Sequence, residues 1–149
     1  MIKAVIFDCD GTILNPQGHG PYPGIPELLQ RLKENEFDLY IWTGRDGPSL
    51  SLFLQKFGLS KYFQDTRSAG ECLPKPHPEG LRQMLGEMGP SQCVVIGDSW
   101  ADMKGAQNFG AYGIGALWGS GAKVETLIEF GSQALVSSPM DCYDVILSF

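Results

Sequence analysis

Two short acidic segments contain the residues of this sequence that are best suited to chemistry. Asp8 and Asp10 stand two positions apart, directly after the apolar run Ala4–Phe7. Asp98 follows a second apolar run, Val94–Ile96. Side chains two positions apart on an extended backbone can face the same side. Because carboxylates that lie close together repel one another unless a cation sits between them, and because hard oxygen ligands suit Mg²⁺, these residues predict a magnesium site.

Groups that bind anions stand in the other loops: Gly11 and Thr12, then Thr43, Gly44 and Arg45, and Lys75 between two prolines. Gly11 lets the backbone turn sharply, so that amides can point at an anion. The hydroxyl of Thr43 and the N–H groups beside it can donate to phosphate oxygens. Lys75 adds a compact positive charge that suits an aspartate nucleophile and a phosphoryl group. Aspartate nucleophiles act through an aspartyl-phosphate, so these groups predict phosphoryl chemistry.

Short apolar runs rich in β-branched residues alternate with helical patterns along the chain. Such alternation is typical of right-handed crossovers, and it predicts an α/β fold with a doubly wound parallel sheet in a three-layer sandwich. In these sheets ligands bind outside the carboxyl ends of the strands, where the polar residues described above are expected to lie. The predicted strands are Ala4–Phe7, Asp38–Trp42, Val94–Ile96, Gly113–Leu117 and Ala134–Val136, with Tyr62–Asp65 as a short edge strand.

Apolar residues spaced for one face of a helix predict two of the helices between these strands. Glycines in the left-handed conformation are expected to end helices at Gly58, Gly89 and Gly110. Ser138-Pro139 is expected to start the last helix. The two apolar stripes are Ile25, Leu28, Leu29 and Leu32, and then Leu81, Met84, Leu85 and Met88.

The composition is that of a globular protein, and one domain over residues 1–149 is expected. Hydrophobic residues make up 43% of the chain and charged residues 19%, which excludes a disordered chain. A net charge of −6 and scattered Lys and Arg argue against nucleic-acid binding. The apolar runs are too short for a membrane span or a signal peptide, so a cytoplasmic location is expected. The cysteines are expected to be reduced and mostly buried.

The acidic and cationic motifs resemble those of the haloacid dehalogenase (HAD) superfamily over most of the chain. The third motif looks like that of the phosphoglycolate-phosphatase-like branch. The first and fourth motifs, taken in order, are highly specific, whereas the second and third would be weak alone. In chain order the four motifs stand as Asp8-Cys9-Asp10-Gly11-Thr12, Thr43, Lys75-Pro76-His77-Pro78 and Gly97-Asp98-Ser99-Trp100-Ala101-Asp102.

The resemblance implies a magnesium-dependent phosphatase that hydrolyses small phosphorylated metabolites. Asp8 would attack phosphorus and become phosphorylated. Asp10 would protonate the leaving oxygen and then activate water. Mg²⁺ would be held by Asp8, by Asp98 and by the backbone carbonyl of Asp10. The transferring phosphoryl group would be held by Thr43 and Lys75, with Asp102 orienting Lys75 or acting from behind the metal.

The spacing of the motifs leaves no room for a cap domain, which many relatives insert after the first or second motif. From Thr12 to Thr43 the chain holds a flap-sized stretch, Ile13–Pro23, followed by one helix and one strand. From Thr43 to Lys75 it again holds one helix, a short strand and a loop. We therefore expect a capless member. Its site would be covered by a large substrate, covered by a neighbouring copy in a homo-oligomer, or left open.

Alternative functions stay open at this stage. A phosphotransferase or a phosphoprotein phosphatase could use the same aspartyl-phosphate. A receiver-like signalling domain without enzymatic activity would use similar residue types, but it places its phosphorylated Asp after a middle strand. Single residues also have structural alternatives: Arg45 could form a surface ion pair, Asp102 could be a first-turn helix acid, and His77 could be an ordinary loop residue.

Overall fold

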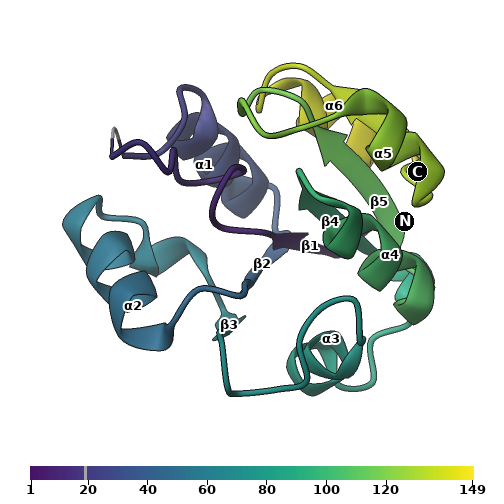
Figure 1. The fold of residues 1–149 in the computed structure, drawn as a ribbon, viewed down its shortest axis with the longest axis horizontal. Coiled ribbons are helices and arrows are strands. Elements are labelled where there is room, and N and C mark those ends of the chain that lie inside the picture. Colours follow the sequence, from purple (N-terminus) through teal and green to yellow (C-terminus); the bar gives the residue numbers. More distant parts are fainter. Residues whose placement is uncertain (19) are drawn as a thin grey trace.

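Six parallel strands form one sheet in a computed structural model that describes residues 1–18 and 20–149. The strand order is β3-β2-β1-β4-β5-β6, which confirms the predicted α/β fold with a doubly wound parallel sheet (Figure 1). Three strand ranges agree with the prediction and the others shift by a few residues. The strands are β1 Ala4–Phe7, β2 Asp38–Trp42, β3 Asp65–Arg67, β4 Cys93–Gly97, β5 Tyr112–Ala116 and β6 Ala134–Val136.

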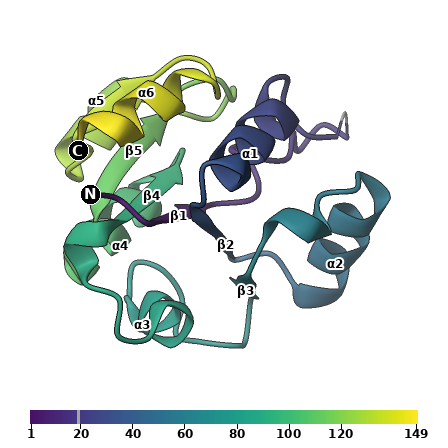
Figure 2. The same cartoon turned by 180° about the vertical axis from the view of Figure 1, so that it is seen from behind.

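Helices cover both faces of the sheet and complete the three layers. α1 and α6 lie against one face and α3 and α4 against the other, while α2 stands beside the β3 edge (Figures 1 and 2). None of the helices in the described ranges is long and apolar enough to cross a membrane. The helices are α1 Ile25–Glu34, α2 Gly47–Lys56, α3 Glu79–Leu85, α4 Trp100–Phe109, α5 Val124–Glu129 and α6 Asp141–Ser148, with short 3-10 turns η1 Ser60–Tyr62 and η2 Pro90–Gln92.

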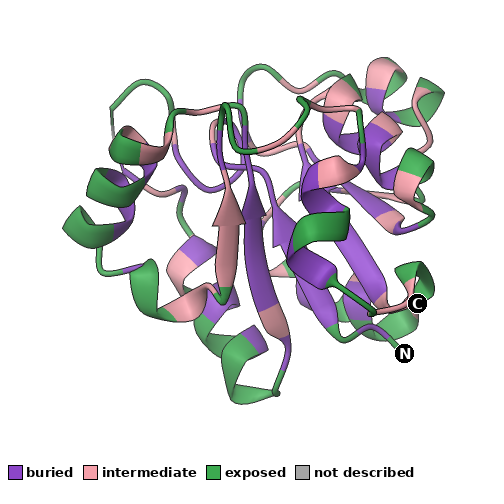
Figure 3. Cartoon of the chain, turned by 90° about the horizontal axis from the view of Figure 1, so that it is seen from below, coloured by how far each residue is buried: buried purple, intermediate pink, exposed green. Residues whose placement is uncertain are grey.

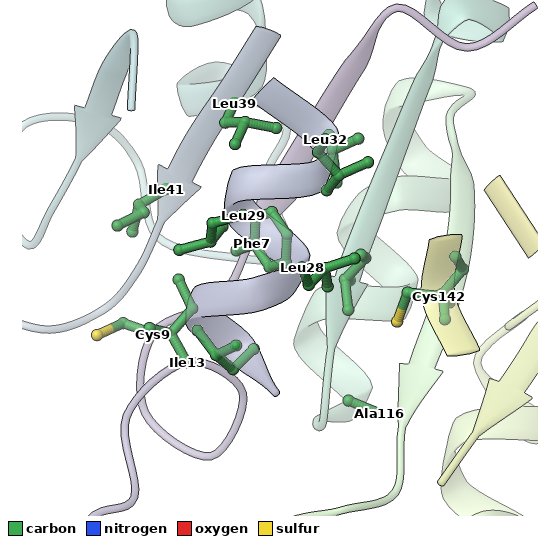
Figure 4. Packing of buried hydrophobic residues seen from close by; sticks show 14 of the residues in the cluster. Phe7, Cys9, Ile13, Leu28, Leu29, Leu32, Leu39, Ile41, Ala116 and Cys142 are labelled. Carbon is green, nitrogen blue, oxygen red and sulfur yellow. The ribbon is translucent and has the colours of Figure 1, made fainter. Parts of the chain in front are cut away.

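The central strand β1 is buried on both faces, because its side chains alternate between two hydrophobic clusters. Val5 and Phe7 face the cluster that contains the predicted apolar stripe of α1. Ala4 and Ile6 face the cluster built with α3 and α4. Figure 4 shows Leu28, Leu29 and Leu32 of α1 beside Phe7 and Leu39 of the sheet. Burial is therefore concentrated in the strands, with exposed residues on the outer helix faces (Figure 3).

The predicted edge strand Tyr62–Asp65 is wrong by several residues. Tyr62 ends a 3-10 turn, and the edge strand is the polar segment Asp65–Arg67, which pairs with the last three residues of β2. The aromatic residues before it pack against the core instead of pairing, and the ring of Phe63 meets Phe7 edge-on at 6.3 Å between centroids. Packing of the half-buried Tyr62 and Phe63 against the core, rather than strand propensity, fixes the position of this segment.

Two helix boundaries also differ from the prediction. Gly89 is extended (φ −65°), and α3 already ends at Leu85, followed by the C-cap Gly86 with a positive φ of 57°. The last helix begins at Asp141, not at Ser138, because the residues from Ser138 first form a turn in which the Asp141 N–H donates to the Ser138 carbonyl at 3.2 Å. Gly58 and Gly110 have the expected positive φ values of 67° and 95°.

The segments around the first three motifs contain no inserted cap domain among residues 1–18 and 20–149. Between β1 and β2 lie the flap, residues 13–23, and α1; between β2 and β3 lie α2 and η1. The flap turns back on itself, since the Tyr22 N–H donates to the Ile13 carbonyl at 2.9 Å. His19 of the flap lies outside the described residues. Among the described residues, the flap and the loops that carry the motifs lie at this edge of the sheet, without an inserted domain.

Candidate active site

The carboxyl ends of β1 and β4 lie side by side at the point where the strand order reverses. The Asp8 N–H donates to the Ile96 carbonyl at 3.0 Å, and Asp98 directly follows β4. This pairing brings together two acidic residues that are ninety positions apart in the sequence. They open onto a cleft of about 720 Å³, the catalytic cleft, which is also lined by Thr43, Arg45 and Lys75.

Lys75 lies between two carboxylates at the floor of the catalytic cleft. Its Nζ is 2.9 Å from Asp8 Oδ1 and 2.6 Å from Asp102 Oδ1. The Nζ also stands over the Trp42 ring, 5.2 Å from the centroid. Burial alone would lower the pKa of Lys75, but the charges of Asp102 and Asp8 outweigh it and raise that pKa above its ordinary value. Asp8 and Asp102 therefore hold Lys75 in its charged form. We call these three residues the Lys75 cluster.

Asp102 is buried behind Lys75 and is fixed through both of its oxygens. Oδ1 accepts from Lys75, while Oδ2 accepts from the backbone N–H of Ser99 at 3.1 Å and from its hydroxyl at 2.9 Å. Ser99 and Asp102 form the capping box of α4, so the helix start and the site share these bonds. Gly97 leaves the necessary room, because a Cβ there would meet the Asp102 carboxyl carbon at 2.3 Å.

Three carboxylates, those of Asp8, Asp98 and Asp102, have oxygen atoms within 4.8 Å of one another. Burial raises the pKa of Asp8 well above its usual range, and the nearby negative charge of Asp102 adds to the rise. Burial also raises the pKa of Asp98. One lysine cannot balance three carboxylates in this space, so the donor set fits a hard divalent cation. Gly11, at φ 86°, is needed beside them, since its Cβ would lie 2.1 Å from Asp98 Oδ2.

Asp10 forms a second ion pair at the mouth of the catalytic cleft, with Arg45. The Arg45 Nη1 is 2.7 Å from Asp10 Oδ1, and the two side chains are 28% and 42% exposed. The backbone N–H of Arg45 donates to the hydroxyl of Thr43 at 3.0 Å, which fixes that side chain at the end of β2. Arg45 Nε is buried without a hydrogen-bond partner among the described residues. We refer to Asp10 and Arg45 as the Arg45 pair.

The structure brings most of the residues singled out from the sequence to this one cleft. Thr12 is different: its side chain is fully buried, its hydroxyl has no partner among the described residues, and its carbonyl accepts from Trp118 Nε1 at 2.9 Å. Cys9 packs in the core as expected, and burial raises its thiol pKa to about 12. The predicted residues that line the cleft are Asp8, Asp10, Thr43, Gly44, Arg45, Lys75 and Asp98.

Two residues of the site were given no role in it by the sequence analysis, although Ser99 stands within the fourth motif. Ser99 holds Asp102, and the sequence carried a signal for this in the Ser-x-x-acid spacing of a capping box. Trp42 lies under Lys75, but nothing in the sequence distinguishes it from any other buried aromatic at the end of a strand. The contact between Trp42 and Lys75 depends on the path of the loop that contains Lys75.

The comparisons with known proteins agree with this fold. Residues 17–110 match the family model for haloacid dehalogenase-like hydrolases. The chain belongs to this family. It is 33% identical over 102 residues to a phosphoglycolate phosphatase of Mannheimia succiniciproducens, covering 66% of this chain and 45% of that protein. It is 28% identical over 100 residues to a pyrophosphatase of Bacillus velezensis, covering 65% and 46%.

A solved structure shares the fold across nearly the whole chain. A HAD-hydrolase from Bacillus subtilis, described as bound to magnesium, superimposes with a TM-score of 0.85 over 97% of this chain and 98% of its own, at 17% identity. The chain spans about half the length of the curated relatives it matches. Family and fold follow from these matches.

Proposed function

We propose that the protein is a magnesium-dependent phosphatase that hydrolyses phosphomonoesters through an aspartyl-phosphate on Asp8. The observation that carries this proposal is the Lys75 cluster. Lys75 uses one oxygen of Asp8 as a hydrogen-bond acceptor at 2.9 Å, and this contact orients the carboxylate at the floor of the cleft. A nucleophile held in this way loses little freedom on attack. The names of the curated relatives, a phosphoglycolate phosphatase and a pyrophosphatase, support phosphorus chemistry.

Asp10 is the acid and base of the proposed reaction. It is the carboxylate of the first motif that does not contact Lys75, and at 42% exposure it can exchange protons with water. In the first step it gives a proton to the leaving oxygen, and in the second it takes one from the water that attacks the aspartyl-phosphate. Thr43 and Lys75 bind the phosphoryl oxygens, where a hydroxyl and an ammonium stabilise the charge of the transition state.

Asp8 and Asp98 are the side chains that would hold Mg²⁺, together with the backbone carbonyl of Asp10. Asp102 is less suited to the metal, because both of its oxygens already accept hydrogen bonds from Lys75 and Ser99. Its role is to position Lys75. Bound Mg²⁺ supplies charge neutralisation between the attacking carboxylate and the phosphoryl group. The magnesium described for the related Bacillus subtilis structure is consistent with this choice of ion.

The substrates proposed for this site are small phosphorylated metabolites. We also propose that a neighbouring copy of the chain covers the open sheet edge.

The family model is that of hydrolases, and the two matched relatives are named as a phosphatase and a pyrophosphatase. These names favour hydrolysis over the receiver-like alternative.

Phosphate release from p-nitrophenyl phosphate tests the proposal. We expect turnover with Mg²⁺, none after chelation with EDTA, and recovery when excess Mg²⁺ is added. Asp8→Asn should lose turnover by at least about 10³-fold while keeping the wild-type circular dichroism spectrum. Asp144→Asn, an exposed change on α6 outside the catalytic cleft, is the matched control. Turnover that survives chelation, or an active Asp8→Asn, would overturn the assignment.

A further inference from the structure

A second cleft of about 580 Å³ lies between the flap and α2 and adjoins the catalytic cleft. We call it the flap cleft. Asp10 and Arg45 line both clefts, so the Arg45 pair forms the boundary between them.

The walls of the flap cleft are largely apolar and in part exposed. Phe53 and Phe57 of the α2 region line it with rings 5.2 Å apart, and Leu14 of the flap faces them. Leu52 is 68% exposed and Phe57 39%, so that together with Phe53 they give this cleft an apolar wall that a ligand can reach. Gly20 brings the flap backbone against Phe57, because a Cβ there would lie 2.9 Å from the ring. The cleft is therefore a built space with the dimensions of a small ligand.

The flap cleft carries positive charge in a protein of net charge −6. Lys56 lines it, with its Nζ 5.4 Å from the centroid of the Phe57 ring. Asp10 is the acid among the described residues that line this cleft, and Arg45 already pairs with it. Lys56 is thus a cation beside an apolar wall without an acidic partner in the cleft, an arrangement that suits an anion attached to an apolar body.

The geometry of in-line displacement indicates where the leaving group of the substrate lies. The attacking and leaving oxygens stand on opposite sides of phosphorus, so the leaving group points away from Asp8. Its oxygen must come within hydrogen-bond distance of Asp10, the proposed acid. Asp10 lines the flap cleft, whereas the small groove beside Trp100 and Lys123 is bordered by Asp98, a proposed metal ligand, and does not include Asp10.

We propose that the flap cleft binds the leaving group of the substrate and selects one that has a planar apolar body and a second negative charge. The apolar body lies against Phe53 and Phe57, and the distal anion lies beside Lys56. Arg45 stands at the point where the leaving group passes from one cleft to the other. This inference rests on the proposed function, because it takes Asp10 as the proton donor. It defines a substrate class for a site beside which the described residues form no inserted cap domain.

A matched pair of aryl phosphates tests the inference. 4-Carboxyphenyl phosphate and 4-carbamoylphenyl phosphate have the same shape and differ by one negative charge. We take the ratio of their kcat/KM values, so that differences in leaving-group reactivity cancel between variants. Lys56→Gln should lower the carboxylate-to-amide ratio by roughly fivefold, the effect expected of an exposed ion pair. Lys61→Gln should leave the ratio at the wild-type value, since Lys61 stands over Tyr62 in the same manner but does not line the cleft.

The possible outcomes distinguish a failure of the leaving-group assignment from a failure of the proposed phosphatase function. An unchanged ratio in Lys56→Gln, or an equal fall in Lys61→Gln, overturns the assignment of the flap cleft to the leaving group. If both esters are still hydrolysed in that case, the proposed phosphatase function stands. Absence of phosphate release from both esters and from p-nitrophenyl phosphate overturns the proposed function itself. A fall confined to Lys56→Gln supports the inference.

Discussion

The Lys75 cluster and the Arg45 pair place one cation beside acidic groups at the same edge of the sheet, yet they differ in burial and in the number of bonds that fix them. The side chain of Lys75 is 11% exposed and bonds two carboxylates, of which Asp102 is 1% exposed. Arg45 is 28% exposed and bonds one oxygen of Asp10, which is 42% exposed. Charges withdrawn from water interact strongly and tolerate the loss of a partner poorly, whereas exposed pairs are weakened by solvent and salt.

This difference matches two different tasks. In the proposed reaction the buried cluster would orient Asp8 as the nucleophile and Lys75 as the cation that binds the phosphoryl group, both of which must be in place before the substrate arrives. The less buried Arg45 pair lies where Asp10 would have to release its partner to meet a leaving oxygen, and a weak pair can be broken at little cost. We therefore expect the Lys75 cluster to be the more rigid of the two and the Arg45 pair the more adaptable. Three substitutions test this comparison, in order of decreasing effect.

Lys75→Met should have the largest effect, because it leaves two close, buried carboxylates without their cation. We expect a loss of about 3 kcal/mol in the free energy of unfolding without metal, and a fall in kcat of about 10²–10³-fold. Urea denaturation and phosphate release measure the two quantities. Lys104→Met on α4 is the control, since Lys104 does not line the catalytic cleft and its side chain bonds only a glutamine among the described residues. Wild-type stability in Lys75→Met would remove the basis of the comparison.

Ser99→Ala should have an intermediate effect. The change removes the N-cap hydroxyl of α4 and one of the bonds to Asp102, so a loss of about 1 kcal/mol of unfolding free energy is expected. Turnover should fall by roughly tenfold, because Asp102 then holds Lys75 less firmly. Ser99→Thr keeps a capping hydroxyl and should recover both quantities. If stability falls but turnover does not, Ser99 serves the helix alone.

Arg45→Gln should have the smallest effect on stability. The Arg45 pair is exposed enough for solvent to weaken it, so the change in unfolding free energy should stay within about 0.5 kcal/mol. The small difference from wild type should shrink further in 1 M NaCl, since salt screens exposed pairs. Thermal unfolding at low and high salt measures it. A loss as large as that of Lys75→Met would show that the two pairs are energetically alike.

The parts of the site that the sequence predicts are those fixed by strand ends. Asp8 and Asp98 meet because the strands before them are neighbours in a parallel sheet, and alternation of strands and helices is enough to expect this. The pairing of Arg45 with Asp10 depends on loop conformation, and both a phosphate contact and an ion pair were compatible with the sequence. The prediction of the edge strand was wrong because the packing of the half-buried Phe63 against the core overrode strand propensity. The C-terminal cap of α3 was predicted at Gly89 and lies at Gly86, because either glycine is compatible with a helix end.

Trapping the phosphorylated protein tests the central claim most directly. Protein mixed with excess p-nitrophenyl phosphate and Mg²⁺ is quenched in acid within milliseconds, digested, and analysed by mass spectrometry. We predict a phosphoryl adduct on the peptide that contains Asp8, located on that residue by fragmentation and absent from Asp8→Asn. Phosphate release by the wild-type protein with no adduct on Asp8, or with an adduct on another residue, would contradict the assignment of Asp8 as the nucleophile.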